Sequence, residues 1–479
     1  MTERDAGATG APGTTGAASP GLRIEDLLQA EAMRRSFERN GLSEEAARTQ
    51  AGLLERCAAA LLERGVEGTS PARAFHVPGR IEVLGKHTDY CGGQSLLAAT
   101  EQGFVFAAVK SEDERIDLVD AVRSERLSFP FLPRLSPLRS HWANYPMTVA
   151  RRLARNFPGP KCGVRAALAS SLPPAAGLST SSAFVVGVFQ VLAGFNKIVE
   201  RSEYRSQVRG EEALASYLAA VENGSGFGSL AGDRGVGTEG GSEDHTAILR
   251  SIPAQLSLYS FSPARLQRRV PLGSQWIFAV ASSGVAAEKT GGARDRFNRA
   301  SRAARALVDL WNQATGSREA HLAGILARGP EGYESLRKIV DRERHPQFSA
   351  EDLLRRLEHF REESEKIIPQ AASALDRGDL DEFGRWADVS QDLGARQLGN
   401  QIPETVFLAS EARRQGARGA SAFGAGFGGS VWALCPRSDR DEFLARWRAA
   451  YEAAFPGRSA EATFFATAAS GAAFEISVP

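Results

Sequence analysis

The chain has 479 residues, and its 58 lysines and arginines against 57 aspartates and glutamates leave a formal net charge of +1. This length is too great for one ordinary hydrophobic core and predicts two domains. The balanced charge gives no reason to expect nucleic acid or a membrane surface as a partner, so small-molecule chemistry is the expectation.

Segment 1–22 is rich in Gly, Ala, Thr and Pro and lacks the apolar core of a signal peptide, so we expect a disordered tail. No later run approaches the ~18 apolar residues of a membrane span. The four cysteines lie far apart, unlike those of a disulfide scaffold or a zinc site. We therefore expect a monomeric protein of the reducing cytoplasm.

Apolar residues recur at helical spacing from Ile24 to about Gly65, and alternating runs typical of strands follow in "RIEVLG", "GFVFAAVK" and "RIDLVDAV". Residues 161–195 then predict a strand, a Pro/Gly loop and an apolar helix. The next helix, "EEALASYLAAVENG", ends at glycine. This is a mixed α/β opening.

The stretch 224–243 contains eight glycines and predicts a flexible loop. The second half begins with an apolar strand, "WIFAVASSGV", continues with long helices, and returns to a strand and loop at "SAFGAGFGGSVWALC". We predict an N-terminal domain over 23–272 and a C-terminal domain over 273–479.

Two glycine-containing stretches are candidates for ligand contact. "LPPAAGLSTSSA" (172–183) precedes a helix, where unpaired N–H groups and the macrodipole attract phosphate. It lacks the Gly-Lys-Ser/Thr ending of a Walker loop, and by itself a helix cap with additional serines explains it equally well. "GAGFGGS" (424–430) lets backbone approach a ligand closely, although glycine-rich turns between strands are common.

Polar side chains gather in two other stretches. "VPGRIEVLGKHTDYCGG" (77–93) places Arg80, Lys86, His87 and Asp89 beside glycines at the end of a strand. "GGSEDHTA" carries Asp244 where the glycine-rich loop ends, a place where acidic residues are often only surface or capping groups. Mg²⁺ with a nucleotide prefers a carboxylate and a hydroxyl, with water and phosphates at its other positions.

In order and spacing, these stretches resemble the signatures of the GHMP small-molecule kinases, and "PGRIEVLGKHTDYCGG" resembles the galactokinase signature in particular. The resemblance runs from about Phe75 to Cys435. It implies a two-domain α/β (α+β) kinase with the active site between the domains. The N-terminal domain would have a left-handed β-α-β crossover, and the C-terminal domain would be ferredoxin-like.

The resemblance also implies roles for individual residues. Asp244 would be the catalytic aspartate, with Arg80 beside it keeping it ionised. His87 and Asp89 would bind sugar hydroxyls. The remaining implied positions are the Mg²⁺ ligands Ser181 and Glu222, the ATP-phosphate loop Pro174, Ala175, Ala176, Gly177, Leu178, Ser179, Thr180, Ser181 and Ser182, and the loop glycines Gly426 and Gly428 that close the site.

The sequence departs from galactokinases in the expected sugar pocket. Lys86 replaces the usual glutamate, and Phe297 stands where a tyrosine is expected. An ammonium cannot accept a hydrogen bond from a 6-hydroxyl, but it would pair with a C6 carboxylate. Alternatively, Lys86 points away from the sugar and pairs with Glu82 or Glu101.

We therefore expect an ATP- and Mg²⁺-dependent kinase that phosphorylates the anomeric C1 hydroxyl of galactose or a close relative. One alternative is a kinase for a C6-acidic sugar such as galacturonate. Another is a catalytically silent sugar sensor on the same fold. Such a sensor would lack the catalytic aspartate or an intact loop 172–183, which we call the serine loop. A kinase for a non-sugar alcohol fits "HTDY" poorly.

Overall fold

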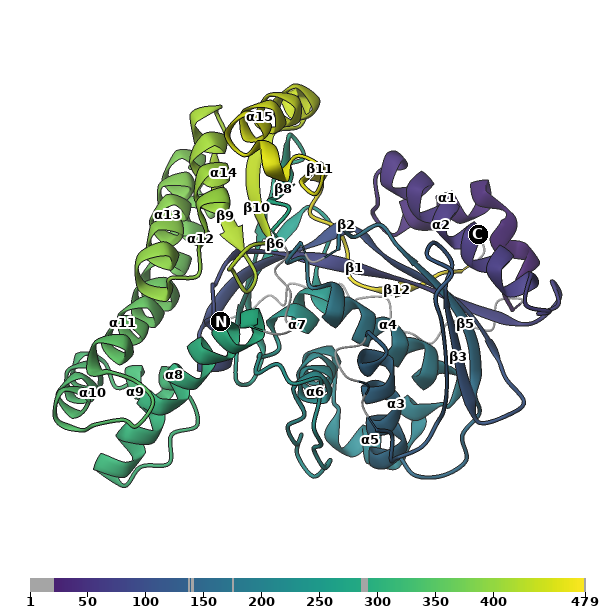
Figure 1. Cartoon of the computed structure of the whole chain (residues 1–479), viewed down its shortest axis with the longest axis horizontal. Helices are drawn as coiled ribbons and strands as arrows, with labels where there is room; N and C mark the ends of the chain where they lie inside the picture. Colours follow the sequence, from purple (N-terminus) through teal and green to yellow (C-terminus); the bar gives the residue numbers. More distant parts are fainter. Residues whose placement is uncertain (1–20, 137, 139–141, 175, 286–291, 478–479) are drawn as a thin grey trace, which may run out of the picture.

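The computed structural model describes residues 21–136, 138, 142–174, 176–285 and 292–477, apart from the side chains of 292–297. They form a mixed α/β fold built on two sheets, as Figure 1 shows. The first sheet has the order β12-β1-β2-β5-β3-β4, and β6 and β7 extend from β2. The second has the order β11-β8-β10-β9.

The strands of the first sheet are β1 (Ala72–Leu84), β2 (Gln94–Lys110), β3 (Arg115–Asp120), β4 (Arg126–Pro130), β5 (Val164–Ser170), β6 (Gln255–Ser260), β7 (Arg265–Pro271) and β12 (Phe474–Glu475). The helices that accompany it are α1 (Ala30–Arg39), α2 (Glu44–Leu62), α3 (Asn144–Asn156), α4 (Thr180–Phe195), α5 (Ser202–Gln207), α6 (Glu211–Asn223) and α7 (Glu243–Arg250). The predicted helical segment 24–65 is thus two helices, because Gly41 turns the chain with φ of 90° between them.

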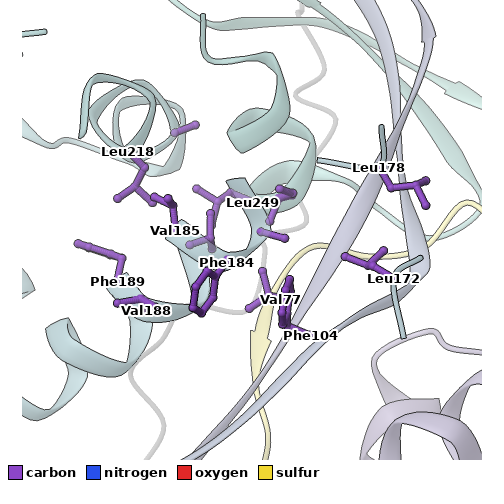
Figure 2. Close-up of a cluster of buried hydrophobic side chains, with 14 of the residues drawn as sticks. Val77, Phe104, Leu172, Leu178, Phe184, Val185, Val188, Phe189, Leu218 and Leu249 are labelled. Carbon is purple, nitrogen blue, oxygen red and sulfur yellow. The ribbon is translucent and has the colours of Figure 1, made fainter. Parts of the chain in front are cut away.

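The central strands are buried on both faces, and their alternating side chains feed two separate cores. Ala74, Val105 and Ala107 face α1 and α2. On the other face, Val77 and Phe104 pack against α4, where the rings of Phe104 and Phe184 stack with centroids 5.5 Å apart. Figure 2 shows this second cluster, which also draws in side chains from α6 and α7. Packing in this core therefore sets the position of the N-terminus of α4.

The second sheet contains β8 (Trp276–Ser282), β9 (Gly419–Phe423), β10 (Ser430–Pro436) and β11 (Thr463–Thr467). If β8, β9, β10 and β11 are numbered 1 to 4, their order across the sheet is 4-1-3-2, and all neighbouring strands are antiparallel. Helices lie between β8 and β9 and between β10 and β11 in the chain. This is the β-α-β-β-α-β arrangement of a ferredoxin-like domain.

The chain changes sheets between Pro271 and Trp276, but its last strand returns to pair with β1. In the first sheet, β3 and β5 pair in parallel, and the chain between them passes through β4 and α3. The left-handed sense of that crossover stays a prediction. Within the described ranges, no helix is long and apolar enough to cross a membrane.

A long helical segment separates β8 from β9. Its helices are α8 (Gly292–Thr315), α9 (Leu322–Leu326), α10 (Pro330–Arg342), α11 (Ala350–Arg361), α12 (Ile368–Asp376), α13 (Leu380–Leu393) and α14 (Pro403–Arg414), and α15 (Arg440–Ala454) follows β10. Helices α8 to α11 share a core of their own and extend away from the sheets at the left of Figure 1. We call this group the helical lobe.

The glycine-rich segment 224–242 packs against the end of α6 rather than forming the loosely held loop that its composition predicted. A Cβ at Gly224 or Gly232 would lie 2.6 Å from a backbone atom, and one at Gly235 would lie 2.4 Å from the carbonyl oxygen of Glu222. Arg151 Nε also donates to Asp233 Oδ2 at 2.6 Å. These glycines permit close contact between backbones.

This packing predicts different effects for two alanine substitutions in the same segment. Gly235→Ala should lower the free energy of unfolding by about 1–3 kcal/mol, because the new Cβ meets Glu222 backbone at a φ of +55°. Gly226→Ala is the matched control: its nearest neighbour would be 3.6 Å away, so stability should be unchanged or slightly higher. Urea denaturation measures both. Equal effects would mean that the segment is not closely packed.

Candidate active site

A cavity of about 60 Å³ lies where the end of β1, α4, α6, α7 and the glycine-rich turn after β9 meet. Its lining includes Arg80, His87, Asp89, Glu222 and Asp244, which come from three separate stretches of the sequence. The tertiary structure thus brings together most of the polar residues that the sequence singled out.

Arg80 is the link between three of these segments. Its Nε donates to Asp244 Oδ1 at 2.8 Å, and its Nη1 donates to the carbonyl oxygen of Gly177 at 2.6 Å. Burial acts to lower the pKa of Arg80, but the carboxylates of Asp244 and Glu82 outweigh it and raise that pKa. The guanidinium therefore stays charged while it joins β1, the serine loop and the first turn of α7.

The hydroxyl that meets Glu222 belongs to Ser182, not to Ser181 as expected. Ser182 Oγ donates to Glu222 Oε2 at 2.9 Å and lies 3.3 Å from Asp244 Oδ2. Ser181 is half-buried and does not line the cavity. The correction follows from helix geometry, since successive side chains of α4 point about 100° apart.

This donor set fits Mg²⁺ shared with a nucleotide. Ser182 and Glu222 offer a hydroxyl and a carboxylate, and His245 Nε2 lies 3.1 Å from the same Glu222 oxygen. In the described part of the chain, no three His, Cys, Asp or Glu side chains are arranged to hold a metal by themselves. Phosphate oxygens and water would then complete the coordination shell.

The serine loop and the glycine-rich turn pack against each other. Ser430 Oγ donates to the carbonyl oxygen of Ala176 at 2.6 Å, and a Cβ at Gly424 would lie 3.0 Å from the carbonyl oxygen of Gly177. Gly177 and Ser179 both have positive φ, so the loop folds back before α4 begins at Thr180. The N-terminus of α4 consequently faces the interdomain space beside the cavity.

The predicted ATP-binding residues stay a prediction, and some of them lie outside the described chain. Gly424 and Ala425 line the cavity, whereas Gly426 and Gly428 do not. A Cβ on Gly426 would lie 2.4 Å from the carbonyl oxygen of Asn400, so that glycine serves loop packing. Ala175 and the side chain of Phe297 lie outside the described residues, and Pro174 is exposed.

His87 and Asp89 line the cavity opposite Ser182. His87 Nδ1 lies 2.8 Å from the hydroxyl of Tyr90, and its Nε2 lies 3.1 Å from the carbonyl oxygen of Ala425. Asp89 accepts hydrogen bonds from the backbone N–H groups of Tyr90 at 2.8 Å and Glu243 at 3.2 Å. These bonds hold both side chains in place without occupying the cavity.

Lys86 does not reach this cavity, which removes the basis for reading it as a partner of a sugar carboxylate. Its Nζ donates to Ser390 Oγ at 2.9 Å and to Ser421 Oγ at 2.8 Å, in the C-terminal domain. The side chain is buried, and burial lowers its pKa although Glu363 acts in the opposite direction. The alternative that it points away is correct, but its partners are not Glu82 or Glu101.

A pair of carboxyl groups, Glu82 and Glu243, belongs to the site although the sequence did not predict it. Both line the cavity, both are buried, and they are hydrogen bonded to each other. Burial raises the pKa of Glu82 to about 7 and that of Glu243 well above its usual range, with mutual repulsion adding to the effect at Glu243. One signal was available: Glu82 lies two residues after Arg80, so both point to the same face of β1.

The raised pKa values predict that stability falls as pH rises. The native state binds more protons than the unfolded chain between pH 4.5 and about 7, so the free energy of unfolding decreases across that window. Glu82→Gln removes this titration and should gain stability over wild type by up to about 1.4 kcal/mol per pH unit. Denaturation curves at several pH values test this, with exposed Glu112→Gln as the control. Parallel curves for wild type and Glu82→Gln would contradict the assignment.

Three family models match the chain in an order consistent with this geometry. The galactokinase galactose-binding signature matches residues 65–110, the N-terminal domain of GHMP kinases matches 144–231, and the C-terminal domain of GHMP kinases matches 371–453. Over these three stretches the chain is similar to the GHMP kinases. Members of this family transfer phosphate to an alcohol, and the signature covers Arg80, His87 and Asp89.

Individual relatives agree with this similarity. A galactokinase of Bos taurus is 27% identical over 81% of this chain and 90% of its own length. One from Actinobacillus pleuropneumoniae serotype 5b is 24% identical over 77% and 86%. The crystal structure of Lactococcus lactis galactokinase complexed with galactose has a TM-score of 0.70 at 20% identity, covering 87% of this chain and 99% of that one. At that identity, the structural likeness establishes the two-domain fold alone.

Proposed function

We propose that this chain transfers the γ-phosphate of ATP to the anomeric C1 hydroxyl of galactose or a close relative. The observation that carries the proposal is the buried Arg80–Asp244 pair, at 2.8 Å, in a cavity also lined by His87 and Asp89. At this point the charged pair meets the serine loop at the N-terminus of α4. It also meets His87 and Asp89, which can bind the hydroxyl groups of a sugar. The galactokinase relatives and signature favour galactose as the acceptor.

The reaction would use these groups as follows. Asp244 accepts the proton of the C1 hydroxyl, or orients that hydroxyl, while the sugar oxygen forms a bond to the γ-phosphorus and the bond to the β-phosphate oxygen breaks. ADP leaves with that electron pair. Arg80 and the N–H groups at the start of α4 stabilise negative charge on the transferred group.

Binding of the acceptor would fall to the opposite wall. His87 and Asp89 meet ring hydroxyls. Glu82 Oε1 is a buried acceptor with no hydrogen-bond donor in the described part of the chain, which suits another hydroxyl. Bound by Ser182 and Glu222, Mg²⁺ would neutralise charge on the nucleotide phosphates. Four unpaired cysteines and an ATP requirement are consistent with a cytoplasmic enzyme.

Asp244→Asn should lower kcat with galactose by roughly 10²–10⁴-fold, because the variant loses the proton acceptor but keeps the shape of the side chain. ADP release measures kcat, and calorimetry should show sugar and nucleotide binding close to wild type. Asp392→Asn, on the exposed side of α13, is the matched control. Undiminished kcat in Asp244→Asn would exclude this aspartate from the chemistry. No turnover of any sugar by wild type would favour the sensor instead.

Alanine substitutions of the neighbouring residues Ser181 and Ser182 should have different effects on the Mg²⁺ requirement of the enzyme. Ser182→Ala removes the hydroxyl bonded to Glu222, so the Mg²⁺ concentration required for half-maximal activity should rise severalfold or more while the galactose KM changes little. Ser181→Ala is the control and should behave as wild type. If Ser181→Ala shows the larger effect, the metal lies on the other side of α4.

A further inference from the structure

A second cavity, of about 310 Å³, lies on the other side of His87. The helical lobe lines one wall, and residues 396–400 with Phe427 line the other. His87 is shared by both cavities. Because His87 borders both cavities, an acceptor that places C1 at Asp244 can extend past His87 into the second.

The wall formed by α11 contains a buried cation that no carboxylate of the described residues binds directly. Arg356 is only 3% exposed, and its guanidinium contacts the carbonyl oxygens of His87 at 2.5 Å and Ala300 at 3.3 Å, the His359 ring at 3.1 Å, Cys91 Sγ at 3.0 Å and the Tyr90 hydroxyl at 3.5 Å. The charge of Asp89 acts on Arg356 without forming an ion pair with it. Buried charges are normally paired directly, so the positive charge of this arginine is only partly compensated at the cavity.

The opposite wall contains a buried donor without an acceptor. Asn400 is 2% exposed, lines the cavity, and has no partner for its Nδ2 within the described chain. Its orientation follows from its neighbours: Gln401 Oε1 accepts from Thr405 and Gln391, so Gln401 Nε2 must donate to Asn400 Oδ1 at 3.0 Å. The unpaired atom of Asn400 is therefore the amide N–H₂.

The cavity rim adds further positive charge. Arg299 and Arg355 both bind the one carboxylate on the rim, Asp352, at 3.1 and 2.6 Å. Arg396 lies across from them, is 74% exposed and pairs with Asp392 at 3.4 Å. Exposed charges of one sign attract an anion and steer it inward, although each contributes little by itself. The buried and exposed groups thus favour the same kind of ligand.

We propose that this second cavity binds an oxyanion group, phosphate or carboxylate, carried by the acceptor sugar on the part of the molecule remote from C1. The proposal rests on the sugar-kinase function and extends it to a class of substrate. Arg356 and Asn400 would bind the anion, and the rim arginines would attract it. Lys86 has no part in this recognition because it lies in the domain interface.

Binding can be tested apart from catalysis. With the nucleotide site filled by a non-hydrolysable ATP analogue and Mg²⁺, wild type should bind inorganic phosphate in calorimetric titrations. Asn400→Asp, which replaces the unpaired donor by a carboxylate of the same shape, should weaken that binding about tenfold or more. Arg396→Ala, at an exposed position where folding is not at risk, should weaken it measurably. Arg342→Ala, exposed on α10 and outside the cavity, should bind as wild type.

Turnover then identifies the source of the anion. Wild type should use galactose 6-phosphate or galacturonate with a kcat/KM about tenfold or more above that for galactose. Asn400→Asp and Arg396→Ala should reduce this preference, and Arg342→Ala should retain it. ADP release provides the rate for each sugar.

The outcomes separate the two proposals. Turnover of galactose with phosphate binding that is absent, or equal in wild type and all variants, overturns the anion site and leaves the kinase function standing. Phosphate binding that depends on Asn400 and Arg396, without preference for acidic sugars, overturns the assignment to the acceptor. Failure of every sugar refutes the kinase function and the link to an acceptor together, while the titration still decides whether the cavity binds an anion.

Discussion

The ion pair between buried Arg80 and partly buried Asp244 is the interaction on which the rest of the site depends. Removing two charges from water is costly, and close hydrogen-bonded geometry is what compensates for it. Here Arg80 also bonds the serine loop through Gly177, so one guanidinium holds β1, the loop before α4 and α7 together. One cation cannot neutralise every carboxylate around it. Burial raises the pKa values of Glu82 and Glu243, and the charge of Glu82 raises that of Glu243 further.

Close contact between backbones gives this site its shape. The serine loop meets the glycine-rich turn at Gly177 and Gly424, and the segment after α6 meets the backbone of Glu222 at Gly235. At such points a side chain would force the segments apart. Glycine therefore allows these loops to come into close contact. Each contact packs a loop that bears functional groups against a helix or strand, which restricts the motion of that loop.

The C-terminal domain holds the end of β1 through several side-chain hydrogen bonds. Trp432 donates to the carbonyl oxygen of Val83 at 3.0 Å, Glu363 accepts from the N–H of Gly85 at 3.1 Å, and Lys86 reaches Ser421. His87, the next residue, has a φ of 59° and turns toward the cavities. This reversal places Lys86 in the domain interface and His87 between an acidic cavity and a basic one. The acidic side chains of one cavity and the basic side chains of the other are thereby separated within the space between the two domains.

The sequence by itself determined the mixed α/β class, the change from one sheet to the next near residue 272, and the polar stretches around Arg80, His87, Asp89 and Asp244. Those features are local, because hydrophobic period and glycine spacing act over a few residues. The tertiary structure decided which of two residues adjacent in sequence faces the site. One step along α4 separates Ser182 from Ser181, and one step beyond β1 separates His87 from Lys86.

The second cavity was beyond the reach of sequence for the same reason. Arg356 lies on α11 and Asn400 in the short loop before α14, and neither has a motif around it. Their significance comes from burial without a partner of the right kind, and burial is a property of the whole packed chain. A sequence specifies which groups are polar, whereas only the fold determines which of them are left to bind something else.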